Sequence, residues 1–248
     1  IVIEVDGIPI VGALYLPDAV SPQPAVCICH GIPSGKPAEP GDGGYPALAE
    51  RVCREGYAVM IFSFRGSGES GGNLEMTGWT RDLKGIIDFL WVHPSVDRAR
   101  LAVAGFSGGA AAAVCVTAQD KRVSGVLPFA CPAEFRMLTE SGDPAEIVAY
   151  HRSIGTIRDD DFPPSAAEWL DGFRRIRPID FIGGISPRPV WLVHGSKDET
   201  VPVRHAYRLF EQAGAPRKLI VIDGAGHRLR HDERAVTALF DGLRSFQQ

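Results

Sequence analysis

Short apolar runs recur along the chain, and each run is continuous rather than interrupted by polar residues. Continuous runs are typical of strands that are buried on both faces of a parallel sheet. Amphipathic or alanine-rich stretches lie between them. This alternation of strand and helix predicts right-handed crossovers and a three-layer α/β domain. The expected strands cover 25–29, 58–62, 101–104, 126–130, 190–193 and 219–222, and the expected helices cover 45–55, 80–91, 107–118, 202–213 and 232–246.

The beginning of the chain follows another pattern. Residues 1–16 alternate between apolar and polar positions on both sides of Asp6-Gly7. Alternation with a period of two is typical of a strand with one exposed face, and an Asp-Gly pair favours the tight turn of a hairpin. We therefore expect an antiparallel hairpin at the N-terminus that leads into a mostly parallel sheet.

The stretch 132–187 has no strong strand pattern. It contains D-P-A-E at 143–146 and S-A-A-E at 165–168, which are helix-start signals because the first residue of each can cap a helix. We expect this stretch to form a helical cap insertion over one end of the sheet. The whole chain, 1–248, would then be a single domain, as is common for α/β chains of this length.

Two serines have the spacing G-x-S-x-G, which is typical of a nucleophilic serine on a strained turn. Ser70 lies among glycines in R-G-S-G-E-S-G-G, well after an expected strand, and this context favours a connecting loop. Ser107 lies in A-V-A-G-F-S-G-G-A-A-A-A, directly between an expected strand and an expected helix. Such a turn holds the side chain at the carboxyl end of the sheet, beside the N–H groups of a helix N-terminus. We therefore predict that Ser107 is the nucleophile.

A nucleophilic serine needs a general base and a group that orients the base. Asp198 follows the strand expected at 190–193, and His227 follows the strand expected at 219–222. The order serine, aspartate, histidine along the chain fits a catalytic triad on such a sheet, with Glu199 as the alternative orienting residue. Four other histidines near strand or helix ends are expected to cap helices or to bond to the backbone: His30, His194, His205 and His231.

An oxyanion hole requires two backbone donors close to the nucleophile. The N–H of Gly108, the residue after the expected nucleophile, is one candidate. The loop H-G-I-P-S-G after the first buried strand is the expected source of the other. Pro33 has no N–H, so Ile32 is the natural donor of that loop.

The motifs together resemble those of the α/β-hydrolase family over essentially the whole chain. The resemblance implies that family's fold and its Ser-His-Asp chemistry for Ser107, His227 and Asp198. In that family the R-G-x-G-x-S element is a structural loop, which gives Ser70 a role outside the chemistry. The matching motifs are H-G-I-P (30–33), F-R-G-S-G-E-S (64–70), G-F-S-G-G (105–109), H-G-S-K-D-E-T-V-P (194–202) and G-A-G-H (224–227).

Within that family, the size and the short cap most resemble small carboxylesterases, including the cinnamoyl and feruloyl type. The segment D-L-K-G-I-I-D-F-L at 82–90 is also similar to prolyl oligopeptidase relatives, which carry a large additional domain. Dienelactone hydrolases are similar in size but have a cysteine where this chain has Ser107. The resemblance implies a serine hydrolase that cleaves short-chain or aromatic carboxylic esters through an acyl-enzyme, with an alcohol or amine as a possible substitute for water.

Two alternative functions remain open. A serine peptidase or amidase would use the same residues, because His227 can protonate an amine leaving group as well as an alcohol. A ligand-binding member of the fold without activity is the second alternative, and a complete set of catalytic residues argues against it. For a small-molecule ester substrate, the candidate contacts in the cap are Phe135, Met137, Tyr150 and Trp169.

Composition and charge narrow the partners. The 248 residues have a formal net charge of −4 and no dense block of basic residues, so we expect no nucleic-acid or membrane partner, and nothing indicates an oligomeric state. We expect no cofactor and no metal, because the possible ligand runs Asp-Asp-Asp at 159–161 and His-Asp-Glu at 231–233 fit a solvated loop and a helix N-terminus. Five cysteines without metal spacing indicate reduced thiols and a cytoplasmic location, although a chain that begins with Ile1 leaves open a removed leader.

Overall fold

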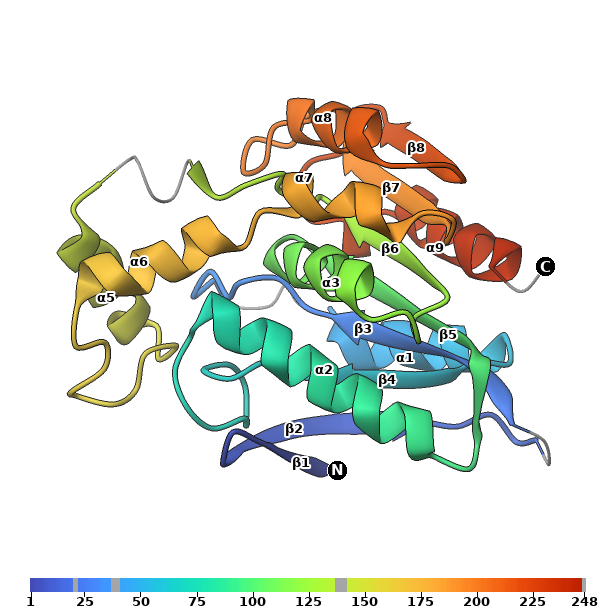
Figure 1. The fold of residues 1–248 in the computed structure, drawn as a ribbon, viewed down its shortest axis with the longest axis horizontal. Coiled ribbons are helices and arrows are strands. Elements are labelled where there is room, and N and C mark those ends of the chain that lie inside the picture. The colour runs from blue at the N-terminus through green and yellow to red at the C-terminus, as the bar shows by residue number, and fades with distance from the viewer. Residues whose placement is uncertain (20–21, 37–40, 137–141, 247–248) are drawn as a thin grey trace.

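A computed structural model describes residues 1–19, 22–36, 41–136 and 142–246 of the chain (Figure 1). Within these residues the chain forms an eight-stranded sheet with the order β1-β2-β4-β3-β5-β6-β7-β8. Neighbouring strands from β4 to β8 in this order are parallel, whereas β2 is antiparallel to both β1 and β4. The strands are β1 (Val2–Val5), β2 (Ile8–Tyr15), β3 (Gln23–Cys29), β4 (Ala58–Phe62), β5 (Val96–Phe106), β6 (Gly125–Phe129), β7 (Val190–Gly195) and β8 (Arg217–Ile222).

Helices cover both faces of the sheet, and the expected three-layer α/β-hydrolase fold is confirmed. The helices α1 and α9 pack on one face, and α2, α3 and α8 pack on the other, with α2 and α3 in front of the sheet in Figure 1. No helix of the described residues is long and apolar enough to cross a membrane. The helices are α1 (Gly44–Arg54), α2 (Met76–Val92), α3 (Gly108–Gln119), α5 (Pro144–Ser153), α6 (Ala166–Arg175), α7 (Pro178–Phe181), α8 (Arg204–Gln212) and α9 (Glu233–Ser245).

Strand β3 is apolar at every position from Pro24 to Cys29, and all of these residues are buried. Cys27 and Cys29 face the layer of α2 and α3, whereas Val26 and Ile28 face the layer of α1 and α9. Successive side chains of a strand point to opposite faces, and here both faces are covered. The continuous apolar run therefore reports burial on both sides, as the pattern predicted.

The N-terminal hairpin forms where the alternating pattern predicted it. Val5 pairs with Ile8, so Asp6 and Gly7 form the two-residue turn between β1 and β2. Both turn residues have positive φ, 54° at Asp6 and 73° at Gly7. This is the turn geometry that Asp-Gly favours, because neither residue has a large side chain to clash there.

The segment between β6 and β7 contains two kinds of helix. The helices α5 and α6 project beyond the sheet at the left of Figure 1, whereas α7 and the 3-10 helix Ile182–Ile185 pack against α3. Both expected start signals cap a helix: Asp143 accepts from the Ala145 N–H at 3.0 Å, and Ser165 accepts from the Glu168 N–H at 3.3 Å. The stretch 132–187 thus combines a projecting pair of helices with helices of the layer beside the sheet.

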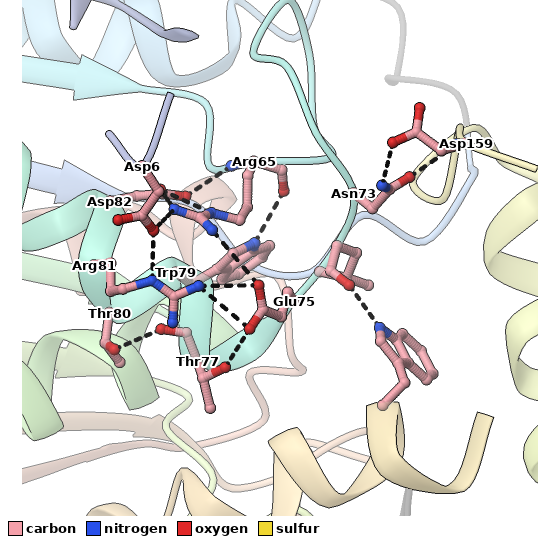
Figure 2. Close-up of polar contacts among 12 residues, drawn as sticks. Asp6, Arg65, Asn73, Glu75, Thr77, Trp79, Thr80, Arg81, Asp82 and Asp159 are labelled. Atoms are coloured by element: carbon pink, nitrogen blue, oxygen red, sulfur yellow. Dashed lines mark hydrogen bonds and ion pairs between the residues drawn. The ribbon is translucent and has the colours of Figure 1, made fainter. Parts of the chain in front are cut away.

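A buried arginine organises the loop between β4 and α2, as Figure 2 shows. Arg65 donates to Asp82 from Nε at 2.9 Å and from Nη2 at 2.7 Å, and Nη2 also lies 2.9 Å from Asp6. Its side chain is 3% exposed and that of Asp82 is fully buried. Burial raises the pKa of the Asp82 carboxyl above its usual value, although the bonds from Arg65 oppose this rise. The ion pair therefore connects this loop to α2 and to the turn of the hairpin.

Replacing Arg65 by methionine is expected to lower the free energy of unfolding by about 3–5 kcal/mol, because it leaves the buried Asp82 carboxylate without a cation and with only the backbone N–H of residue 65 as a donor. Urea unfolding followed by circular dichroism would measure the change. The control is Arg81→Gln, which removes partly exposed ion pairs with Asp6 and Glu75 and should cost less than about 1 kcal/mol. Equal losses in the two variants would contradict this account.

Candidate active site

Ser107 lies on a strained turn between β5 and α3. Its backbone has φ 53° and ψ −121°, a conformation that residues with a side chain rarely adopt. The turn is held by hydrogen bonds on both sides, since the Ser107 N–H donates to Phe129 O at 2.8 Å and Ser107 O accepts from the Ala110 N–H at 3.0 Å. The fold therefore fixes this one side chain at the carboxyl end of the sheet.

Two glycines allow this turn to form. A Cβ atom on Gly109 would lie 2.1 Å from the backbone oxygen of His30, and one on Gly105 would lie 2.6 Å from the Cα atom of Ala110. Both contacts are with backbone, so neither could relax by a side-chain rotation. The spacing G-x-S-x-G at this turn is thus a packing requirement around Ser107.

A continuous line of hydrogen bonds joins the three residues that the sequence singled out. Ser107 Oγ lies 2.9 Å from His227 Nε2, and His227 Nδ1 lies 2.8 Å from Asp198 Oδ2. The carboxylate can only accept, so it fixes the proton on Nδ1 and leaves Nε2 to accept from the serine hydroxyl. The geometry brings a nucleophile, a base and an orienting carboxylate into contact.

Asp198 is held as an ionised carboxylate. Its Oδ1 accepts from the Thr200 N–H at 3.0 Å and the Val201 N–H at 2.8 Å, and His194 Nε2 lies 3.4 Å from Oδ2. Burial raises the pKa of Asp198, but the interactions with His194, His227 and the Val201 N–H outweigh it and hold that pKa well below its usual value.

Two backbone amides beside Ser107 have no acceptor within the part of the chain that the structure describes. They belong to Ile32 and Gly108, the two residues that the sequence proposed for an oxyanion hole. The amides are close together, because a Cβ atom on Gly108 would lie 3.5 Å from the Ile32 nitrogen. On the same loop, a Cβ atom on Gly31 would lie 3.0 Å from the Cβ atom of Ser107. A negatively charged oxygen next to Ser107 could accept from both donors.

Three hydrogen bonds in this region brace loops rather than reach the site. Ser70 is fully buried, and its Oγ accepts from the Val11 N–H at 2.8 Å and donates to Ser63 O at 2.5 Å. His30 accepts from the Phe64 N–H at 3.0 Å through Nε2. Both side chains tie the loop after β4 to neighbouring strands, so the structural loop expected around Ser70 is what the structure contains.

Two cavities meet at Ser107 and His227. The larger, of about 760 Å³, runs from Ser107 past the middle of β2 and the end of β4 to the exposed residues Gly68 and Glu69. The smaller, of about 480 Å³, lies under the projecting helices, and we call it the cap cavity. Its lining outside Ser107 and His227 includes Ile32, Pro132, Glu134, Phe135, Tyr150, His151, Thr200, Val201 and His205.

The candidate substrate contacts of the cap have different outcomes. Phe135 and Tyr150 line the cap cavity. Trp169 lines neither cavity: its indole N–H donates to Leu74 O at 2.6 Å, and the ring packs edge-on against Phe173. The expectation for Trp169 was therefore wrong, because this residue attaches α6 to the body of the protein. Met137 lies outside the described residues.

The acidic runs also have structural partners. Asp159 accepts from Asn73 Nδ2 at 2.7 Å, a contact shown in Figure 2. Asp232 caps α9 by accepting from the Arg234 N–H at 2.9 Å, and Glu233 pairs with Arg51 on the surface. These contacts agree with the loop and helix-start roles that the sequence indicated.

Sequence reasoning missed an ion pair in the wall of the larger cavity. Arg230 donates to both carboxylate oxygens of Asp42 at 2.6 Å, and its guanidinium lies 5.1 Å from the centre of the Tyr45 ring. The bonds from Arg230 hold the pKa of Asp42 well below its usual value. No local pattern could have shown this pair, since its members are 188 positions apart.

The fold and the arrangement around Ser107 define an α/β hydrolase. Residues 47–247 match the prolyl oligopeptidase family, and the chain belongs to this family. The segment at 82–90, which resembles prolyl oligopeptidase relatives, lies inside the matching region.

Individual proteins that resemble the chain share its fold. PA2218 of Pseudomonas aeruginosa, an uncharacterized protein, is 25% identical in sequence, and the match covers 89% of this chain and 72% of PA2218. The crystal structure of PA2218 has a TM-score of 0.77 at 21% identity, and this match covers 100% of this chain and 92% of that one. Est1E of Butyrivibrio proteoclasticus, in a structure with bound ferulic acid, has a TM-score of 0.76 at 20% identity and covers 100% and 97%. An acetyl xylan esterase from Paenibacillus sp. R4 has a TM-score of 0.74 at 18% identity and covers 98% and 82%.

Proposed function

We propose that the protein is a serine hydrolase that cleaves short-chain or aromatic carboxylic esters, with Ser107 as nucleophile, His227 as general base and acid, and Asp198 as the orienting carboxylate. The observation that carries the proposal is the line of hydrogen bonds from Asp198 through His227 to Ser107, beside the backbone amides of Ile32 and Gly108, which have no acceptor among the described residues. A strained serine that only maintained the fold would need neither a base nor free donors next to it.

The first half of the proposed reaction forms an acyl-enzyme. Ser107 Oγ attacks the ester carbonyl carbon while its proton passes to His227 Nε2. The carbonyl oxygen becomes negative and accepts from the N–H groups of Ile32 and Gly108. The bond to the alcohol oxygen then breaks, and His227 gives that oxygen the proton.

The second half returns the enzyme to its starting state. Water attacks the acyl carbon and passes a proton to His227 Nε2. The bond between the carbon and Ser107 Oγ breaks, and the serine oxygen takes the proton back. The Asp198 carboxylate stays ionised throughout and stabilises the positive charge that His227 carries in each half.

The two cavities suggest where each half of the ester binds. The alcohol must leave before water attacks, so we place it in the larger cavity, which reaches the exposed residues Gly68 and Glu69. The acyl group stays attached to Ser107, and we place it in the cap cavity. A space of about 480 Å³ suits a short or arylalkyl acyl group better than a long lipid chain.

Membership of the prolyl oligopeptidase family supports a second candidate, a serine peptidase or amidase. The same three residues would carry it, because His227 would protonate an amine leaving group. The similar structures of Est1E with bound ferulic acid and of an acetyl xylan esterase support ester hydrolysis instead. Substrate preference, rather than the geometry around Ser107, separates the two candidates.

Each methylene that fits the cap cavity is expected to add roughly 1 kcal/mol of transition-state binding. We therefore expect kcat/KM for nitrophenyl esters to rise with acyl length and to fall once the cap cavity is full. The measurement is kcat/KM along an acyl series from acetate to palmitate, with an aminoacyl nitroanilide alongside. Short and arylalkyl esters should be fastest. A maximum at palmitate, or a preference for the anilide, would overturn the proposed substrate class.

A further inference from the structure

Two buried histidines, which the proposed reaction does not use, line the cap cavity. His151 comes from α5 and is 3% exposed, and His205 comes from α8 and is 5% exposed. They reach the same cavity from two separate parts of the fold: His151 from the projecting helices and His205 from the helix layer beside the sheet. A histidine that only packed in the core would have no reason to line the acyl side of the site.

Each histidine uses Nδ1 for a hydrogen bond within the protein. His205 Nδ1 accepts from the Ala133 N–H at 3.1 Å, so its proton is on Nε2. His151 Nδ1 shares a hydrogen bond of 2.9 Å with Thr156 Oγ1. Neither Nε2 atom has a hydrogen-bond partner among the described residues. Neither atom belongs to the fully buried and unpaired side-chain atoms of the described residues, which are Ser67 Oγ and Thr117 Oγ1, so both are accessible from the cavity to a polar group of a ligand.

Burial keeps both rings neutral. It lowers the pKa of His151 to about 4, and it lowers the pKa of His205 below its usual value, with the charges of Arg204 and Arg208 acting in the same direction. A neutral imidazole is a hydrogen-bonding group and not an anion site. Because the rings bring no positive charge, an uncharged polar group is a better partner for them than a carboxylate.

The remaining walls of the cavity restrict the ligand further. Phe135, Pro132 and Val201 are apolar and can contact a hydrocarbon chain or ring. Glu134, the one acidic residue in the lining of this cavity, already pairs with Arg208 at 2.8 Å and Arg177 at 3.1 Å. Lys36 and Arg228 also line the cavity, but both are exposed, so the buried part of the lining carries no cation of its own. An acyl group that fits this buried part is mainly apolar and bears an uncharged polar substituent.

We propose that the cap cavity selects acyl groups that carry a hydroxyl, which pairs with Nε2 of His151 or His205. A hydroxyl both donates and accepts, so it matches the Nε2–H of His205 and either tautomer of His151. This inference rests on the proposed hydrolase function and makes the two histidines specificity-determining residues. An ester whose acyl group is wholly apolar would leave both nitrogens unpaired, and the site would discriminate against it.

The test compares nitrophenyl esters of 3-phenylpropanoate with a hydroxyl or a methyl group at the same ring position, in the 3- and 4-substituted series. The two substituents have similar size, so a difference reports hydrogen bonding. We expect kcat/KM to be roughly tenfold higher for the hydroxyl ester in at least one series. In the double variant His151→Phe/His205→Leu, the ratio should fall to within about twofold.

A matched control is His93→Leu, which removes a histidine at the end of α2 that lines neither cavity, and it should keep the full preference. Equal rates for hydroxyl and methyl esters in the wild-type enzyme would overturn the inference while leaving the hydrolase function intact. An unchanged ratio in a folded double variant would overturn it as well. Failure of the proposed function would look different, because neither ester would be cleaved.

Discussion

Replacing Ser107 by alanine is expected to lower kcat for a nitrophenyl ester by about 10⁶, which is the scale of losing a triad serine. The reason is chemical, since the variant keeps the turn, the backbone amides of Ile32 and Gly108 and both cavities but has no side-chain oxygen to form the acyl-enzyme. Initial rates with purified variant and wild type would measure the loss. A Ser107→Ala enzyme with more than about a tenth of the wild-type kcat would contradict the assignment.

Ser70 offers a matched control because it has the same G-x-S-x-G spacing. Its hydroxyl is already bonded to Val11 and Ser63, and the side chain is fully buried. We expect Ser70→Ala to change kcat less than tenfold in the folded protein, with its main effect on stability. A much larger loss in Ser70→Ala than in Ser107→Ala would reverse the roles of the two serines.

Replacing Asp198 by asparagine is expected to lower kcat by roughly 10⁴ while the fold is kept. In the wild type the carboxylate accepts from the Nδ1–H of His227 at 2.8 Å. An amide can instead donate to Nδ1, so that the histidine proton is on Nε2, and a protonated Nε2 cannot accept the proton of Ser107. Circular dichroism would establish that the variant is folded, and kcat with a nitrophenyl acetate would give the loss.

Glu199 provides the comparison for this substitution, since the sequence left it open as the orienting residue. Its side chain is exposed, and the carboxylate in contact with His227 belongs to Asp198. Glu199→Gln should keep kcat within a few-fold of wild type. If Glu199→Gln were the more damaging change, the arrangement of the site described above would not be the one that operates in solution.

The sequence predicted most of the fold because a strand that is buried on both faces is apolar at consecutive positions. The run at 58–62 coincides with β4, and the Asp6-Gly7 turn lies between β1 and β2. The position of Ser107 could also be predicted, since a strand, a crowded turn and an alanine-rich helix follow one another in a short segment. Asp198 and His227 were predictable from the rule that parallel strands end at a common edge.

The interior of the cap could not be predicted in the same way. The sequence does not distinguish an aromatic residue of a helix that packs inward from one that faces a ligand. Trp169 bonds to Leu74, 95 positions earlier, whereas Tyr150 lines the cavity. His151 and His205 were also missed as a pair, because they come from helices that only the three-dimensional fold brings to one cavity. Contacts between distant segments decide these roles, and such contacts leave no local pattern.

The most direct test of the account is labelling of the intact protein with a fluorophosphonate, followed by identification of the modified peptide by mass spectrometry. Such a probe reacts with a serine that an adjacent base activates and that can place the phosphoryl oxygen in an oxyanion hole. We expect one adduct, on Ser107, and none in the Ser107→Ala protein. An adduct on Ser70, or an unlabelled wild-type protein that is folded, would contradict the central claim that Ser107 is the nucleophile of a serine hydrolase.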